Sequence, residues 1–231
     1  MKTIGLLGGM SWESTESYYR LINQTVKNKL GGLHSAKLIL HSVDFAEIEQ
    51  LQHLGEWEKT ADILKKAAQG IEKAGADFIL ICTNTMHLVA PQIQAGINIP
   101  LLHIADATAE EIVKAGIKKI GLLGTAFTME EDFYKGRLEK QFSLEVIRPG
   151  ASDRKIVHQI IYDELCLGKI ENVSRDEYLR IIDKLVEQGA EGVILGCTEI
   201  ALLVEPKHTN TRLFDTTMLH ALKAVEKALL D

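Results

Sequence analysis

The feature that most constrains the fold of this chain is an internal duplication. The stretch GADFILICTNTMHLVAP, residues 75–91, has a counterpart, GAEGVILGCTEIALLVEP, at residues 189–206, and a shift of 114 positions places Thr83 on Cys197. A second pair, KTIGLLGGMSW near the N-terminus and KKIGLLGTAFT near the middle, is 116 positions apart. Two repeats with nearly the same offset indicate a duplicated half, because self-similarity at a fixed period marks repeated structural units.

Short apolar runs alternate with helix-like patterns along both halves, which is typical of parallel sheets covered by helices on both faces. Strands are expected at residues 3–7, 37–43, 78–81, 99–104, 119–123, 144–147, 192–195 and 212–214. Helices are expected at about residues 13–30, 59–74, from 85 to a break at Pro91, 109–115, 131–141, 156–167, 175–188 and 219–230. The fold class predicted is therefore α/β, with two similar domains related by a pseudo-twofold.

The expected first domain comprises residues 1–99 plus 208–231, because the last helix belongs with the first half by repeat logic. The expected second domain comprises residues 100–207. In open parallel sheets ligands bind outside the carboxyl ends of the strands. We therefore expect the site in a cleft where the two sets of strand ends face each other.

Composition excludes several classes of partner. The 231 residues are 46% hydrophobic, enough for a sizeable core, and carry a formal net charge of −6 without a basic run. This argues against nucleic acid or an anionic membrane as partner. Three scattered cysteines form no disulfide framework or zinc-finger spacing, no apolar run reaches membrane-spanning length and no signal peptide is recognisable. A cytoplasmic protein is expected.

Cys197 is the cysteine best placed for chemistry, since it ends a predicted strand and precedes the helix-like run 200–204. A helix N-terminus lowers the pKa of a thiol, which favours the reactive thiolate. The alternative is a buried structural cysteine, and that interpretation is favoured for Cys82, in mid-strand, and for Cys166, on a helix. His87 is expected to be a surface or capping histidine rather than a base.

Other polar residues at the predicted strand ends have both a functional and a structural interpretation. Gln52 could grip a carboxylate or lie on the solvated surface. Asn84, Thr85, Thr125 and Thr198 could bind a ligand or simply form turns and helix caps. Gly8-Gly9-Met10 could bind an anion at the following helix start, but it is not the GxGxxG of a dinucleotide fold, and NAD is not expected.

The sequence resembles the cofactor-independent aspartate/glutamate racemase family, in particular its bacterial broad-specificity amino-acid racemases. The resemblance covers essentially the whole chain and is carried by GLLGGMSWEST, HSVDFAEIE, TNTMH, GLLGTAFTM, IYDELCLG and GCTEI. It implies two α/β domains, a homodimer, an amino acid as small-molecule substrate, and no pyridoxal phosphate or metal. It also implies two opposed acid/base cysteines, the second at Cys197, whereas Thr83 stands where the first is customary.

Position by position, the resemblance implies substrate-binding roles for Met10, Gln52, Asn84, Thr85, Thr125 and Thr198. Some relatives grip the distal carboxylate with a basic residue near IYDELCLG, but Leu165 and Cys166 stand there in this chain. The hypothesis is an asymmetric racemase. Cys197 removes the α-proton and Thr83 returns one on the other face. In the family the second cysteine customarily serves the L face, so the resemblance implies that L-substrates are favoured.

Two alternatives stay open. A relative with one cysteine could protonate the carbanion left by decarboxylation of a malonate-like acid or isomerise a maleate-like acid, which Cys197 alone would suit. A two-lobed binding module that closes on an amino acid without chemistry is the third hypothesis. It is ranked last because a binder has no need of a thiol at the strand end.

Overall fold

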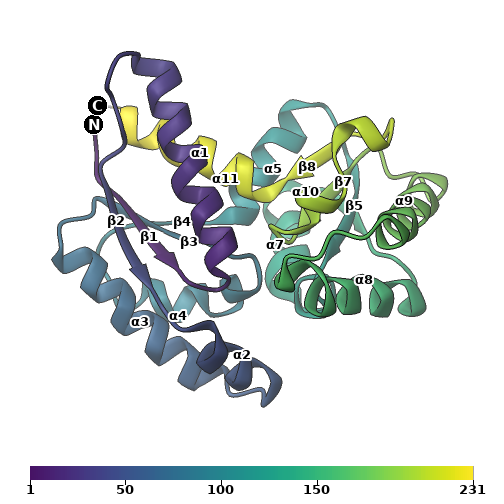
Figure 1. Ribbon diagram of the computed structural model, residues 1–231, viewed down its shortest axis with the longest axis horizontal. Helices are drawn as coiled ribbons and strands as arrows, with labels where there is room; N and C mark the ends of the chain where they lie inside the picture. Colours follow the sequence, from purple (N-terminus) through teal and green to yellow (C-terminus); the bar gives the residue numbers. More distant parts are fainter. Residues whose placement is uncertain (231) are drawn as a thin grey trace. The chain divides into compact units, whose positions relative to one another are not determined.

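The computed structural model describes residues 1–230, whose contacts divide the chain into two compact units. Unit 1 contains residues 1–104 together with the segment from Thr217 to the C-terminal end, and unit 2 contains residues 105–216. Each unit is a parallel four-stranded sheet flanked by helices (Figure 1), so the predicted fold class of two similar α/β domains is confirmed. The boundaries predicted at residues 99 and 208, and the cleft between the domains, stay predictions.

The sheet of unit 1 has the strand order β2-β1-β3-β4. Its strands are β1 (Ile4–Gly8), β2 (Leu38–Ser42), β3 (Phe78–Ile81) and β4 (Leu101–Leu102). In β1 and β3 every residue is buried, as expected for central strands of a parallel sheet, which read as continuous apolar runs. Leu7 of β1 lies opposite Ile81 of β3, which fixes where these two strands end.

Two hydrophobic clusters cover the two faces of this sheet because successive side chains of a strand point to opposite faces. Ile79 and Ile81 pack on one face, and Phe78 and Leu80 on the other. The helices of unit 1 are α1 (Trp12–Leu30), α2 (Phe45–His53), α3 (Trp57–Lys73), η1 (Thr85–Val89), α4 (Ala90–Gln94) and α11 (Thr216–Leu229). The last of these helices, α11, comes from the C-terminal part of the chain.

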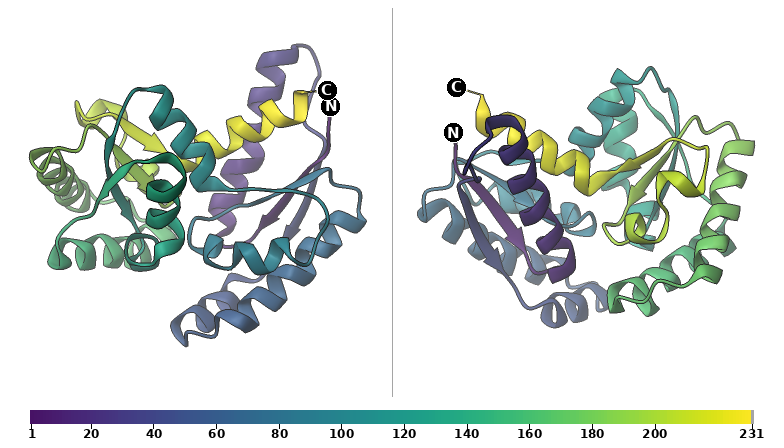
Figure 2. Two further views of the ribbon diagram at one scale, coloured as in Figure 1. Left: turned by 180° about the vertical axis from the view of Figure 1, so that it is seen from behind. Right: turned by 45° about the horizontal axis from the view of Figure 1, so that its top comes forward.

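The C-terminal helix α11 packs against the N-terminal strand, as repeat logic predicted. Ala221 and Val225 lie in one buried cluster with Ile4 and Leu6 of β1. Next to this cluster the amide of Lys2 donates to the carbonyl of Ala228 at 2.8 Å, so the end of α11 lies beside the start of β1 (Figures 1 and 2).

Unit 2 repeats the same strand order, β6-β5-β7-β8. Its strands are β5 (Lys119–Gly124), β6 (Glu145–Ile147), β7 (Val193–Gly196) and β8 (Leu213–Asp215). Its helices are α5 (Ile104–Lys114), α6 (Ala126–Glu130), α7 (Asp132–Phe142), α8 (Ala151–Asp163), η2 (Leu165–Leu167), α9 (Asn172–Glu187), α10 (Ile200–Leu203) and η3 (Pro206–His208). Leu123 of β5 lies opposite Leu195 of β7, so the central strands pair as in unit 1.

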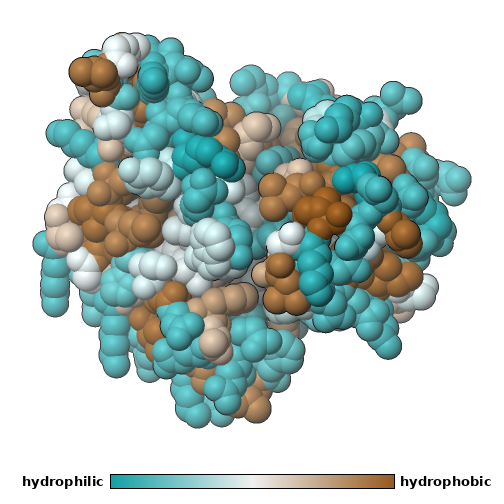
Figure 3. All heavy atoms as spheres, in the orientation of Figure 1, coloured by the Kyte–Doolittle hydropathy of each residue, from teal (hydrophilic) through white to brown (hydrophobic). Residues whose placement is uncertain are grey.

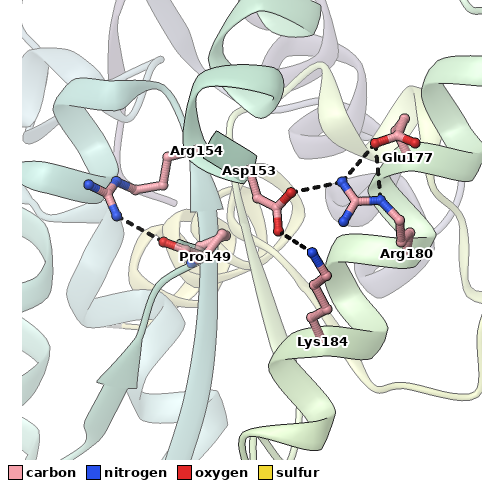
Figure 4. A network of polar contacts seen from close by, with 6 residues as sticks. All are labelled: Pro149, Asp153, Arg154, Glu177, Arg180 and Lys184. Atoms are coloured by element: carbon pink, nitrogen blue, oxygen red, sulfur yellow. Dashed lines mark hydrogen bonds and ion pairs between the residues drawn. The ribbon is translucent and has the colours of Figure 1, made fainter. Parts of the chain in front are cut away.

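An ionic network joins α8 to α9 on the outside of unit 2 (Figure 4). Asp153 of α8 accepts from Arg180 at 2.8 Å and from Lys184 at 2.9 Å, while Arg180 also pairs with Glu177 at 2.7 Å. The Arg180 and Lys184 cations lower the pKa of Asp153, whose side chain is only 10% exposed. This carboxylate is therefore a structural group that stabilises the packing of the two helices.

Several elements differ from the sequence expectation. The strand expected at residues 99–104 is reduced to the two residues of β4: before it the Glu72 side chain accepts from the amide of Ile99, and after it α5 begins at Ile104. The helix expected from Thr85 is a 3₁₀ turn, and Pro91 lies in the first turn of α4, where its missing N–H costs nothing.

In unit 2 the sequence missed α6, a helix too short to show a period. The helix expected over residues 156–167 ends at Asp163, and its last residues form the 3₁₀ turn η2. Cys166 therefore lies in a turn and is half-buried, so the prediction that it faces the core from a helix is wrong.

The surface is mixed, with hydrophilic residues surrounding smaller apolar areas on the face shown in Figure 3. Scattered exposed apolar side chains, such as Trp12 and Leu33, are ordinary for folded proteins. Among residues 1–230 no helix combines the length and apolar character needed to cross a membrane.

Candidate functional site

The turn after β1 brings Met10 to the carboxyl end of the unit 1 sheet. Gly9 has φ +91°, and a Cβ there would lie 2.2 Å from the carbonyl oxygen of Val43, so glycine is required. The amide of Gly9 donates to Thr15 Oγ1 at 2.8 Å, and Ser11 caps α1 by accepting from the amide of Ser14 at 3.3 Å. Met10 is buried at this turn.

Gln52 reaches the end of β3 from α2. Its side chain is 3% exposed, and its Nε2 lies 3.7 Å from Met86 Sδ in η1. The expectation that Gln52 lies on the solvated surface is therefore wrong. The residue is drawn inward because α2 crosses the carboxyl edge of the sheet, and its amide lies beside the residues that follow β3.

Thr83 lies just beyond the end of β3 and is half-buried. Asn84 and Thr85 follow it and are both buried, at 3% and 7% exposure. Cys82 precedes it, and it is fully buried in the core cluster with Phe78, so its prediction as a structural cysteine is confirmed. Burial raises the pKa of the Cys82 thiol, which keeps it protonated.

His87 is 1% exposed, and the expectation of a surface position is therefore wrong. Its Nδ1 lies 2.8 Å from the carbonyl oxygen of Thr83, and its Nε2 lies 3.2 Å from the amide of Ile104. Sequence periodicity could not show this burial because the Ile104 contact lies 17 residues further along the chain.

The equivalent edge of unit 2 holds Thr125, Cys197 and Thr198. Gly124 of β5 lies opposite Gly196 of β7, so Thr125 and Cys197 leave adjacent strands at the same level. Thr125 is 5% exposed and caps α6, its hydroxyl accepting from the amide of Thr128 at 3.3 Å. The capping interpretation of Thr125 is thus confirmed, and a ligand role remains compatible with it.

Cys197 is half-buried and is paired with Glu199. Its thiol donates to Glu199 Oε2 at 2.9 Å, and the hydroxyl of Thr198 donates to the same oxygen at 2.9 Å. Glu199 is 4% exposed. Its buried carboxylate is therefore hydrogen-bonded to the side chains of the two residues that precede it in sequence. The sequence alone assigned no role to Glu199.

Burial, followed by the negative charge of Glu199, raises the pKa of the Cys197 thiol well above its ordinary value. The expectation that a helix start lowers this pKa is therefore wrong. Helix α10 has only four residues and begins at Ile200, three positions after the cysteine. The Glu199 carboxylate, in direct hydrogen-bond contact, outweighs the weak dipole of so short a helix.

The pair can interconvert two protonation states. With the proton on sulfur, Cys197 is an acid; with the proton moved to Glu199 Oε2, 2.9 Å away, it is a thiolate base. A thiolate is the form that removes a proton from carbon or attacks an electrophile. The arrangement therefore suits a thiol that alternates between acid and base.

Each unit gathers its own share of the predicted site residues at the carboxyl edge of its sheet. Unit 1 holds Met10, Gln52, Thr83, Asn84 and Thr85, and unit 2 holds Thr125, Cys197 and Thr198. In the described part of the chain, residues 1–230, no group of three or more His, Cys, Asp or Glu residues is arranged to hold a metal ion.

Comparisons with known proteins point to one family. The family model described as Asp/Glu/hydantoin racemase matches residues 7–224. A curated relative, the broad-specificity amino-acid racemase RacX of Bacillus subtilis (strain 168), is 22% identical, and the match covers 98% of each chain.

Two similar solved structures span nearly the whole chain. A Yersinia pestis protein, provisionally described as an Asp/Glu racemase, is 58% identical with TM-score 0.94, over 100% of both chains. An aspartate racemase homologue from Pyrococcus horikoshii is 38% identical with TM-score 0.86, over 99% of both. A mutant of arylmalonate decarboxylase, 10% identical with TM-score 0.57 over 99% of this chain and 93% of its own, shares the fold alone.

Proposed function

The chain belongs to the Asp/Glu/hydantoin racemase family, and from this premise we propose that it is a cofactor-independent amino-acid racemase of the aspartate/glutamate type. It acts on the α-carbon of a free amino acid and favours the L enantiomer. The observation that carries the proposal is the Cys197–Glu199 pair at the end of β7, since it gives a thiol a neighbouring group that can take its proton.

The reaction begins when the proton of Cys197 moves to Glu199. The resulting thiolate removes the α-proton of an L-amino acid, leaving a carbanion at the α-carbon. The hydroxyl of Thr83 donates a proton to the opposite face, which inverts the centre. Water then reprotonates Thr83, and Glu199 gives the proton that it took from Cys197 to the hydroxide left behind, which restores all three groups. Two acid/base groups on opposite faces are what inversion at a carbon requires.

The two groups are unequal, so the two enantiomers lose their α-hydrogen at different rates. A threonine hydroxyl is a far weaker acid than a thiol, whose reference pKa is about 8.5. It can give a proton to a strongly basic carbanion, but it is a poor base for removing one from a D-amino acid. L-substrates therefore exchange their α-hydrogen faster than D-substrates, while kcat/KM for racemisation is the same from either enantiomer because the two are equally stable.

The remaining predicted site residues hold the substrate in this proposal. Met10, Gln52, Asn84, Thr85, Thr125 and Thr198 contact its α-carboxylate, ammonium and side-chain end. Burial of Gln52, Asn84 and Thr85 supports such roles, because buried amides and hydroxyls at a strand end can bind polar groups with little competition from water. The absence of a basic residue at Leu165 and Cys166 leaves the distal group of the substrate to other contacts.

A chiral assay tests the proposal. The purified protein is incubated without added cofactor with L- and D-enantiomers of aspartate, glutamate and a panel of other amino acids, and products are separated by chiral chromatography. Conversion of an L-amino acid into its D-enantiomer is expected. A protein that converts none of the panel, while binding one of its members, would be the two-lobed binding module instead.

A decarboxylase is the second candidate, favoured by the single cysteine among the two strand-end positions, Thr83 and Cys197. Such an enzyme would use Cys197 to protonate the carbanion left when a malonate-like acid loses carbon dioxide. Release of carbon dioxide from an arylmonosubstituted malonate, without racemisation of any amino acid, would select it.

A cytoplasmic homodimer completes the proposal. Both the cytoplasmic location and the homodimer are proposed from the resemblance to the racemase family. Analytical ultracentrifugation of the purified chain tests the assembly, and a sedimentation coefficient of a monomer at micromolar concentration would contradict it.

A further inference from the structure

His87 is a buried histidine that the reaction above does not use, and both of its ring nitrogens are bonded to the backbone. Nε2 lies 3.2 Å from the amide of Ile104, which can only donate, so Nε2 is the accepting nitrogen. The proton of the neutral ring is therefore on Nδ1, which donates to the carbonyl oxygen of Thr83 at 2.8 Å. One tautomer satisfies both contacts.

The surroundings keep the ring in this neutral form. Burial, and the nearby rings of His103 and His220, lower the pKa of His87 well below its ordinary value. The His103 ring centroid lies 4.5 Å from that of His87, and the His220 centroid lies 5.9 Å away. A charged imidazole would lose the lone pair that accepts from Ile104 and would face two other histidines.

A second histidine fixes the segment that His87 holds. His220 Nε2 lies 2.9 Å from the carbonyl oxygen of Leu102, and its Nδ1 lies 2.7 Å from the hydroxyl of Tyr18. The segment from Leu102 to Ile104 is thus bonded at both ends by buried histidines from two different elements. Ile104 is consequently a firm anchor for the ring of His87.

From this geometry we propose that His87 is a positioning residue for Thr83. By tying the Thr83 carbonyl to the Ile104 amide, it holds the backbone at the end of β3 in one conformation and thereby aims the Thr83 hydroxyl. The inference rests on the proposed function, in which that hydroxyl returns the proton to the α-carbon.

Proton transfer from Thr83 depends on the position and orientation of its hydroxyl relative to the α-carbon. Proton transfer requires the two heavy atoms to be within about 2.6–3.2 Å of each other. A displacement of about 1 Å can lower a rate about 100-fold. Loss of the Thr83 bond should therefore slow the return of the proton without affecting its removal by Cys197.

Two variants of His87 separate the two bonds. In His87→Asn the side-chain amide nitrogen occupies the place of Nδ1 and can still donate to Thr83, while the Ile104 contact is lost. In His87→Gln the amide lies at the place of Nε2, where its oxygen can accept from Ile104, while the Thr83 contact is lost. The two side chains are both neutral amides, so each is the matched control of the other.

The readout is a partition ratio measured with L-aspartate or L-glutamate in D₂O. Deuterium in the recovered L-amino acid reports removal and return of the proton by Cys197, and the D-product reports proton return by Thr83. We expect His87→Gln to raise the ratio of L-exchange to D-product about tenfold, chiefly through kcat, and His87→Asn to leave it within about twofold of wild type.

The outcomes distinguish the inference from the function on which it rests. The same measurement extends to every amino acid of the chiral-assay panel, and wild-type protein that neither exchanges nor racemises any of them would overturn the proposed function and the inference with it. Wild-type racemisation with an unchanged ratio in His87→Gln would overturn the inference alone.

A measurement on the wild-type protein is independent of how the variants fold. Histidine ¹⁵N chemical shifts at neutral pH should show His87 as the neutral Nδ1–H tautomer. A protonated ring, or the Nε2–H tautomer, would overturn the inference.

Discussion

The ends of β3 and β7 are equivalent in the duplicated sequence, yet different contacts hold their key side chains. At β3 a buried neutral histidine, His87, binds the backbone of Thr83. At β7 a buried carboxylate, Glu199, binds the thiol of Cys197 itself. The residue equivalent to His87 is Ala201, and the one equivalent to Glu199 is Thr85. Duplication has therefore kept the strand end in both units while the contacts around it have diverged.

In the proposed reaction, this difference is how one scaffold supports two unequal acid/base groups. A thiol needs a partner for its proton, because a thiolate is its working form as a base. A hydroxyl that only donates needs no such partner, but it needs a fixed direction. Each end has the contact that its own group requires, and four predictions break or sharpen this comparison.

The largest effect is expected from removing the thiol. Cys197→Ala should lower kcat for L-to-D conversion by about 10³- to 10⁴-fold, since the base that takes the α-proton is gone. Cys82→Ala is the matched control, because Cys82 is fully buried in the core and should leave kcat near wild type. Steady-state kinetics with chiral product detection decides. A Cys197→Ala enzyme that stays within about tenfold of wild type would place the base elsewhere.

Substitutions of Thr83 should have the second-largest effect on activity. Thr83→Ala should lower D-product formation from the L-substrate by about 100-fold, because no group returns the proton on that face. Thr83→Cys should instead raise conversion of D-substrates about tenfold or more, since a thiol is a far better base than a hydroxyl. Initial rates from both enantiomers measure the change. A Thr83→Cys enzyme as unequal as wild type would show that the asymmetry arises from another group.

Removing the charge of Glu199 beside the Cys197 thiol should have a smaller effect: both the pKa of the thiol and kcat should fall. Glu199 raises the pKa of Cys197, so Glu199→Gln should lower that pKa and bring thiolate absorbance to lower pH. The variant also loses its proton acceptor, and kcat should fall about tenfold. Ultraviolet titration of the thiolate tests the sign. A pKa that is unchanged or higher in Glu199→Gln would show that the carboxylate does not govern the thiol.

The smallest effect on chemistry is expected far from either strand end. Asp153→Asn removes the carboxylate that joins α8 to α9 and should lower the free energy of unfolding by about 1–3 kcal/mol at neutral pH. The folded-state pKa of Asp153 is lowered, so its contribution is present above the unfolded value of about 3.9. It is lost as pH falls through the lower folded-state value.

Urea unfolding of wild type and Asp153→Asn at neutral and acid pH measures this difference, which should shrink in acid, while kcat stays at wild type. A difference that persists unchanged below the folded-state pKa would contradict the assignment of the network as the cause.

Much of the fold could be predicted because it depends on local pattern and repetition. The apolar runs at Phe78–Ile81 and Val193–Gly196 are buried on both faces, so they read as strands at once. The placement of the C-terminal helix followed from the duplication. The length of β4 could not be predicted, because it depends on Glu72 accepting from the amide of Ile99 and on the start of α5 at Ile104.

The sequence predicted which residues follow the strand ends in the candidate site, but not how the side chains around them are buried and bonded. Position alone placed Thr83 and Cys197 after equivalent strands. The burial of Gln52 depends on a contact with Met86, and that of His87 on a contact with Ile104, neither of which leaves a periodic signal. The raised pKa of Cys197 depends first on its burial and then on the nearby Glu199 carboxylate, and sequence spacing specifies neither.

The central claim is that the two acid/base groups are unequal, and α-hydrogen exchange in D₂O tests it most directly. Wild-type protein is incubated separately with each enantiomer of aspartate and glutamate, and deuterium at the α-carbon is followed by proton NMR. The account predicts that the L-enantiomer of the preferred amino acid loses its α-hydrogen faster than the D-enantiomer. Equal rates of loss from both enantiomers would contradict it.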